Sequence, residues 1–219
     1  MKHRVFVGRW APEALLLLAA AGLLAAPGDA MALPVLSEVF YDAMGSDDGA
    51  GFIEIYGAPG EALDGLSLEG VNGSGGSVTV AIALSGVIPD DGLFVVADRT
   101  AAGATLVAEA DLLANFDLQN GPDSVVLRSA TAILDALGYG VFGAGEIFAG
   151  EVSSAPDAPA GSSLARRFAD QDGDDNAADF VVLSSPTPGT APTLGVPEPA
   201  PVLLWASFLW ALGPRARGR

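Results

Sequence analysis

Acidic side chains at alternating positions are the first feature of this sequence that could do chemistry. They lie in the stretch DQDGDDN, residues 170–176. Side-chain oxygens spaced in this way along a short loop can wrap a hard cation such as Ca²⁺. The sequence therefore predicts a possible calcium site, whose candidate ligands are Asp170, Asp172, Asp174, Asp175 and Asn176.

This loop departs from the EF-hand pattern at two positions. Asp175 stands at the sixth position, where that pattern requires Gly, and Val181 stands where it requires a bidentate Glu. A solvated acidic loop is the alternative interpretation. A second acidic group lies between two predicted strands and is interpreted as a hairpin loop; it consists of Asp42, Asp47 and Asp48.

Two adjacent arginines, Arg166 and Arg167, are the other charged residues that stand out. They are half of the four basic residues between positions 33 and 199. They could capture an anionic group. The simpler hypothesis, which we favour, is that they pair with the surrounding carboxylates and hold the predicted strand at 163–168 in place.

Several catalytic chemistries are excluded by the residue types that are missing. The chain has no cysteine, its one histidine is His3, and residues 33–199 contain neither Lys nor Trp. This central part therefore cannot form a Ser-His-Asp triad, a histidine- or cysteine-ligated zinc site, or a lysine Schiff base. Paired carboxylates remain, and these can hydrolyse glycosides. Because no aromatic-rich stretch would line a sugar cleft, we expect a protein that is not an enzyme.

The charge of the central region limits its partners. Residues 33–199 hold 25 of the 27 acidic residues but only 4 of the 10 basic residues, a net charge of −21. Such a surface repels nucleic acid and anionic lipid, so we expect no nucleic-acid partner. It favours solubility and the binding of cations.

Short apolar segments separated by turn residues indicate an all-β domain. The turns are rich in Gly, Pro, Asp and Asn, as in PDDG at 89–92 and NGPD at 120–123. One short helix is predicted within 101–115. A β-sandwich is the expected architecture and a β-barrel the alternative. The predicted strands and short segments are 35–41, 52–56, 63–68, 78–84, 93–97, 124–127, 132–134 and 180–183, with loops at 70–76 and 150–163. The unbroken apolar run at 93–97 predicts a strand buried on both faces, and the segments 124–127 and 132–134 predict a hairpin.

The amino-terminal 32 residues have the pattern of a signal peptide. Basic residues come first, and an apolar run at 14–26 follows, of the length of a signal-peptide core and too short to span a bilayer comfortably. Ala30 and Ala32 frame an A-x-A cleavage site, with Gly28 and Ala30 as a second choice. We therefore expect the protein to be exported.

The carboxyl terminus has three parts in order. Val196, Pro197, Glu198 and Pro199 precede an apolar run at 200–213. The chain closes with Arg215, Arg217 and Arg219, which the positive-inside rule would keep on the cytoplasmic side of a membrane. Because the apolar run is short for a full span, a transient or processed membrane anchor is expected.

This arrangement resembles the PEP-CTERM sorting signal of Gram-negative bacteria. The resemblance covers only the last two dozen residues, and it implies processing by an exosortase at the cell envelope. Two features depart from the family: Pro214 interrupts the chain before the arginines, and the apolar helix is short.

Residues 34–190 resemble the lamin-tail domain, an immunoglobulin-like β-sandwich. The resemblance rests on seven pieces in order: LSEV at 36–39, GFIEIY at 51–56, LDGLSL at 63–68, the segment 89–98, NGPDSVVL at 120–127, SLAR at 163–166, and DF at 179–180 before TPG at 187–189. The chain departs from the family at Gly51, Gly57 and Ser67, where Glu, Asn and Trp are usual. The family implies a binding or structural module.

These features predict four regions: a signal peptide at 1–32, a lamin-tail-like β-sandwich at 33–190, a linker at 191–199 and a hydrophobic helix with a basic tail at 200–219. We expect a non-catalytic, exported binding or structural module of the cell surface or extracellular matrix. Its partner would be an exopolysaccharide or a surface protein. The alternatives are a calcium-stabilised structural surface protein without a discrete ligand and a carboxylate-based glycoside hydrolase.

Overall fold

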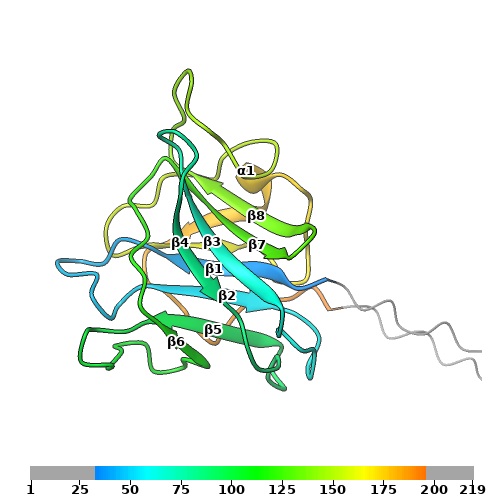
Figure 1. The fold of residues 1–219 in the computed structure, drawn as a ribbon. Helices are drawn as coiled ribbons and strands as arrows, with labels where there is room; N and C mark the ends of the chain where they lie inside the picture. Colours follow the sequence, from blue (N-terminus) through cyan, green and yellow to red (C-terminus); the bar gives the residue numbers. More distant parts are fainter. Residues whose placement is uncertain (1–32, 196–219) are drawn as a thin grey trace, which may run out of the picture. The chain divides into compact units, whose positions relative to one another are not determined.

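The computed structural model describes residues 33–195, which form two β-sheets (Figure 1). The predicted signal peptide, with Ala30 and Ala32, and the predicted sorting signal from Val196 onward lie outside the described residues. The strands are β1 (Val35–Phe40), β2 (Phe52–Tyr56), β3 (Leu66–Asn72), β4 (Val78–Ala83), β5 (Leu93–Asp98), β6 (Leu112–Ala114), β7 (Asp123–Ser129), β8 (Ile133–Tyr139), β9 (Ser163–Arg166) and β10 (Phe180–Leu183). One short helix, α1 (Asn176–Asp179), precedes β10.

The two sheets confirm the expected all-β sandwich. The six-stranded sheet has the order β10-β9-β1-β2-β5-β6, and the four-stranded sheet has the order β4-β3-β7-β8. Every strand pair is antiparallel except β5 and β6, which run parallel. The core lies between the sheets, because buried side chains of both, such as Ile53 and Leu127, belong to one apolar cluster.

The six-stranded sheet is buried on its outer face as well. Ile53 and Ile55 of β2 point into the core, while Phe52 packs with Val95 and Val107 in a second cluster on the opposite face. All six residues of β5 are consequently buried. This confirms the prediction that the apolar run at 93–97 is a strand covered on both sides.

The predicted helix within 101–115 is wrong. The segment forms turns and then β6, whose Leu112 and Leu113 pair with Val96 and Ala97. The Asp111 carboxylate accepts a hydrogen bond from Val95 N at 2.8 Å, and Asp111 N donates to Val95 O at 2.9 Å. These bonds satisfy the backbone beside β5, so leucines that fit no clean strand pattern still form a sheet edge.

Strand β3 is longer than the sequence indicated. The predicted loop at 70–76 begins only after Asn72, because Gly70 and Val71 continue the pairing with β4 and β7. A side chain at Gly70 would come within 3.1 Å of Val80 Cβ, so the glycine allows close packing inside the sheet rather than a turn. The predicted hairpin of β7 and β8 is confirmed.

Candidate functional site

The side chain of Arg166, on β9, lies in the interior of the sandwich and connects the two sheets. Its Nη2 lies 2.8 Å from Oδ2 of Asp135 on β8, and both side chains are fully buried. Its Nε donates to Leu36 O on β1 at 2.9 Å, and the guanidinium carbon lies 4.6 Å from the ring centre of Phe180. The bonds therefore tie β1, β8 and β9 together, with the ring of β10 stacked on the cation.

The other half of the guanidinium reaches the loop after β9. Nη1 lies 3.1 Å from carboxylate oxygens of both Asp172 and Asp179, and 3.3 Å from Gln171 O. The predicted pairing of Arg166 with surrounding carboxylates is confirmed. For the neighbouring Arg167 the same prediction is wrong: it is exposed, forms no ion pair among residues 33–195, and donates its Nε to Ala178 O at 2.8 Å.

Three carboxylates converge beside this arginine. One oxygen each from Asp135, Glu151 and Asp172 lie within 4.8 Å of one another, close enough for one cation to contact all three. Asp135 is buried on β8, Glu151 is half-buried in the loop after β8, and Asp172 is exposed. We call Asp135, Glu151 and Asp172 the carboxylate trio.

The crowding of the trio alters its protonation. Burial raises the pKa of Glu151 to about 8, with repulsion from Asp135 and Asp172 adding to the effect and Arg166 opposing it. Burial also raises the pKa of Asp135, while Arg166 and the Leu36 N–H favour its ionised form. At neutral pH the trio therefore holds a proton on Glu151. A divalent cation bound there would displace that proton.

Asn176, the first residue of α1, positions Glu151. Its side-chain oxygen accepts hydrogen bonds from Gly138 N at 2.8 Å and Glu151 N at 2.9 Å. Its amide nitrogen donates to Ala136 O at 2.8 Å and to Glu151 Oε2 at 3.3 Å. A single buried amide thus connects β8, α1 and the Glu151 loop.

The five predicted calcium ligands have different partners in the structure. Only Asp172 belongs to the trio. Asp170 accepts from the backbone N–H groups of Leu194 and Gly195. Asp175 caps α1 by accepting from Ala177 N, Asn176 is bonded to β8, and Asp174 has a left-handed backbone with φ of 54°. Calcium bound by all five would have to replace several of these bonds.

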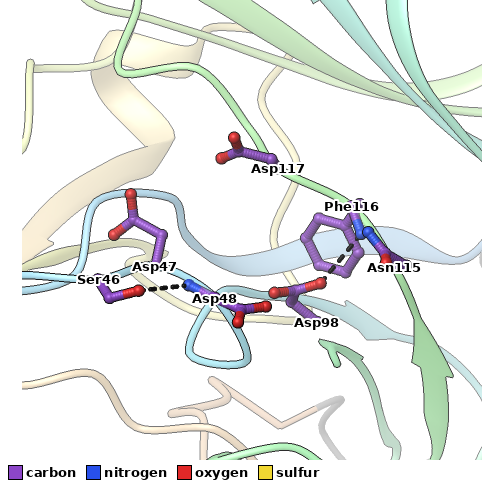
Figure 2. Close-up of a pocket in the computed structure, with 7 residues that line it drawn as sticks. All are labelled: Ser46, Asp47, Asp48, Asp98, Asn115, Phe116 and Asp117. Atoms are coloured by element: carbon purple, nitrogen blue, oxygen red, sulfur yellow. Dashed lines mark hydrogen bonds between the residues drawn. The ribbon is translucent and has the colours of Figure 1, made fainter. Parts of the chain in front are cut away.

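A second acidic site lies at the carboxyl end of β5, around its last residue, Asp98. Asp47 and Asp48 of the loop after β1, Asp98 at the end of β5, and Asp117 after β6 line a cavity of about 300 Å³. Figure 2 shows how these side chains lie. The two oxygens of Asp98 accept from Gly49 N at 2.7 Å and Phe116 N at 3.0 Å. Asp98 therefore connects the loop between β1 and β2, which is the predicted hairpin loop, to the segment that follows β6.

Two buried glutamates form a pair on the outer face of the six-stranded sheet. Glu38 of β1 is directly opposite Glu54 of β2, and neither is more than 1% exposed. Glu38 accepts from Ser163 Oγ at 2.5 Å, and from Thr187 N at 2.9 Å and Thr187 Oγ1 at 2.7 Å. Glu54 accepts from Gly189 N at 2.6 Å, and burial raises its pKa to about 7. The segment 186–195, which we call the strap, thus lies over the pair.

The glutamate pair bears on the glycosidase alternative. That chemistry requires two carboxyl groups on opposite sides of a bound sugar, separated by about 5 Å or more. Glu38 and Glu54 instead stand side by side on neighbouring strands, and residues 187–189 of the strap bond to both. Their hydrogen bonds connect the strap to the sheet, so the pair as it stands has a structural use.

Comparison with protein-family models, with curated proteins and with solved structures returned no match. Within residues 33–195, the structure has no helix of the length and apolar character that crossing a bilayer requires.

We expect the Arg166–Asp135 pair to show strong energetic coupling. The variant Arg166→Met leaves the Asp135 charge buried without its partner, and should lower the free energy of unfolding by about 3–5 kcal/mol. The double variant Arg166→Met/Asp135→Leu removes both charges and should lose less than the two single variants summed. Urea unfolding followed by circular dichroism measures all four proteins. Strictly additive losses would contradict the coupling.

We also expect stability to fall as the pH rises towards 8. Between the usual glutamate pKa near 4.3 and the folded-state value of about 8, the folded protein binds a proton on Glu151 that the unfolded chain has lost. The slope is at most about 1.4 kcal/mol per pH unit for one proton, and because Glu151 is partly exposed, solvent screening narrows the pH range over which it applies. Glu54 acts in the same direction up to about pH 7.

Urea unfolding at a series of pH values tests this expectation. The variant Glu151→Gln should flatten the fall between pH 7 and pH 8, while Glu109→Gln, at an exposed glutamate, serves as the matched control. A Glu151→Gln profile that runs parallel to the wild-type profile would be inconsistent with proton binding at this site.

Proposed function

We propose that this protein is an exported, non-catalytic binding or structural module of the cell envelope or extracellular matrix of a Gram-negative bacterium, sorted through a PEP-CTERM-type signal. The observation that carries the proposal is the arrangement of the chain. A basic and apolar leader ending in Ala30-Met31-Ala32 precedes the domain, and Pro197-Glu198-Pro199, an apolar run and three arginines follow it.

The fold and the site are consistent with this proposal. A two-sheet sandwich is the architecture that the lamin-tail resemblance of residues 34–190 implies, which supports membership in that family. The buried carboxylates of Glu38, Asp98 and Asp135 all accept hydrogen bonds that connect separate segments of the chain. This use of the acids supports a structural rather than a catalytic purpose.

The sorting proposal predicts processing that depends on the motif. In a Gram-negative host with an exosortase, the envelope-associated protein should begin at residue 33 and should lack the peptide that contains Arg219. Replacing Pro197, Glu198 and Pro199 with alanine should leave that peptide in place, because the processing enzyme reads the motif. Intact-protein mass spectrometry makes the measurement.

The control variant for this experiment is Pro201→Ala, which removes a proline just outside the motif. It should be processed like the wild type. Retention of Arg219 in the wild-type protein, in hosts with and without an exosortase, would refute the sorting proposal.

A calcium-stabilised structural protein without a discrete ligand is the second candidate, and the carboxylate trio favours it. Three carboxylate oxygens within 4.8 Å suit Ca²⁺, although Arg166 already pairs with two of the three residues. A cation that binds only the folded state raises its stability, by about 2.7 kcal/mol at a hundredfold excess over the dissociation constant.

One pair of measurements on the exported chain separates the two candidates. The binding-module proposal expects selective retention by exopolysaccharide or by envelope extract, and a melting temperature that millimolar calcium leaves unchanged. The calcium alternative expects the reverse: no selective retention, and a rise in melting temperature that Glu151→Gln abolishes. A rise that survives Glu151→Gln would place the cation outside the trio.

A further inference from the structure

The sandwich has four sheet edges, and an open edge can pair with another strand. The six-stranded sheet ends at β6 and β10, and the four-stranded sheet ends at β4 and β8 (Figure 1). An edge strand presents unpaired backbone N–H and C=O groups, which natural proteins protect by coverage, shortness, charge or proline.

Three of the four edges carry such protection. On β8, the Asn176 amide donates to Ala136 O and accepts from Gly138 N, and Ala155 N donates to Gly138 O. Strand β6 has only three residues and lies between Asp111 and Asp117. Strand β10 has four residues and is followed closely by Pro186.

Strand β4 differs from the other edges. It has six residues, and no charged residue occurs from Gly70 to Pro89, a stretch that includes all of β4. Leu84 N donates a hydrogen bond to Leu66 O, its opposite residue on β3. Because hydrogen-bonded and non-hydrogen-bonded pairs alternate along antiparallel strands, the backbone groups of the even-numbered residues of β4 point towards β3. The backbone groups of Ala81 and Ala83 therefore point away from β3. Within residues 33–195, no backbone hydrogen bond reaches Ala81 or Ala83 from the open side.

The pattern of β4 is complementary to itself. If two copies pair antiparallel about a two-fold axis beside Ala81, Val80 of one copy stands opposite Ile82 of the other on the buried face. Thr79 then stands opposite Ala83 on the exposed face. Such β-branched cross-strand pairs stabilise sheets, and small residues on the outer face avoid collisions.

The self-complementary pattern favours a second copy as the occupant of this edge, and the absence of charge on β4 permits it. Residues 33–199 carry a net charge of −21, so two copies that meet at an average surface bring carboxylates together. Strand β4 itself carries none, and Glu69, opposite Ala81 on β3, already pairs with Arg128. We propose that the protein forms a two-fold dimer in which β4 pairs with β4 and the two four-stranded sheets become one continuous sheet. This proposal does not depend on export or sorting.

The oligomeric state of residues 33–219 tests the proposal. Sedimentation velocity over a range of concentrations should show a dimer in equilibrium with a monomer. The variant Ala81→Lys places two like charges opposite each other at the axis and should weaken the dimer at least about tenfold. The control Ala108→Lys makes the same change at another exposed alanine and should dimerise like the wild type.

A cross-link tests the register independently. The chain has no cysteine, so Ala81→Cys introduces a single thiol per copy. Directly opposed residues of antiparallel strands have Cα atoms about 4.5–5.5 Å apart, which a disulfide can bridge. Mild oxidation should therefore link Ala81→Cys into a covalent dimer, whereas Ala108→Cys should stay largely unlinked.

Two results would overturn the proposal. One is a wild-type chain that stays monomeric up to its solubility limit. The other is a dimer that Ala81→Lys leaves intact, which would assign the association to a different surface, such as the apolar carboxyl-terminal run. The melting temperature of Ala81→Lys, measured by circular dichroism, should match that of the wild-type monomer. This control shows that the variant is folded, so that a weaker dimer cannot be due to unfolding.

Discussion

The buried ion pair of Arg166 and Asp135 is the constraint on which the rest of the structure depends. Removing both charges from water is costly, and their attraction offsets that cost only when their remaining hydrogen-bonding groups also find partners. Here Leu36 donates its N–H to Asp135 and offers its carbonyl to Arg166, so one residue of β1 serves both ions. Because Arg166 is on one sheet and Asp135 on the other, these bonds fix how the sheets meet.

The small number of basic side chains explains why the other acidic side chains are bonded to the backbone. Only four basic residues accompany the many acids of this domain, so most carboxylates cannot find an ion-pair partner. Backbone N–H groups take that place: Gly73 N donates to Asp123, Gly49 N to Asp98 and Leu194 N to Asp170. Hydrogen bonds of this kind to an ionised acceptor are stronger than those between neutral groups. The acids therefore order loops that contain many glycines.

Local patterns in the sequence predicted the strands well. The bounds of β2 and β10 agree with prediction, and the burial of β5 on both faces followed from its unbroken apolar run. Strand β6 escaped prediction because its three residues depend on parallel pairing with Val96, a contact that no local periodicity records. The prediction of a loop at Gly70 fails for a related reason, since the role of this glycine is close packing against Val80.

The site was harder to predict than the fold. The spacing of the acidic loop at 170–176 predicts a local cation site, yet its Asp172 lies beside Asp135 and Glu151, which come from other parts of the chain. A signal for Asp135 did exist, because a lone aspartate interrupts the apolar run ILDALGY of β8. Such an acid requires a buried partner, and Arg166 in SLAR was the available candidate. Their pairing also depends on sheet packing, which spacing alone does not reveal.

The strap at 186–195 has a mechanical consequence. In a chain held by its carboxyl end, tension enters the domain at Gly195, and the first bonds to bear it are those of Gly195 and Leu194 to Asp170. The bond from Ala169 N to Pro192 O comes next, followed by those of Gly189 to Glu54 and Thr187 to Glu38, and only then does the load reach β10. The hydrogen bonds of the strap would thus break in sequence, from Gly195 towards Thr187, before any strand pairing is lost. The strap would act as a sacrificial element that yields before the sandwich does.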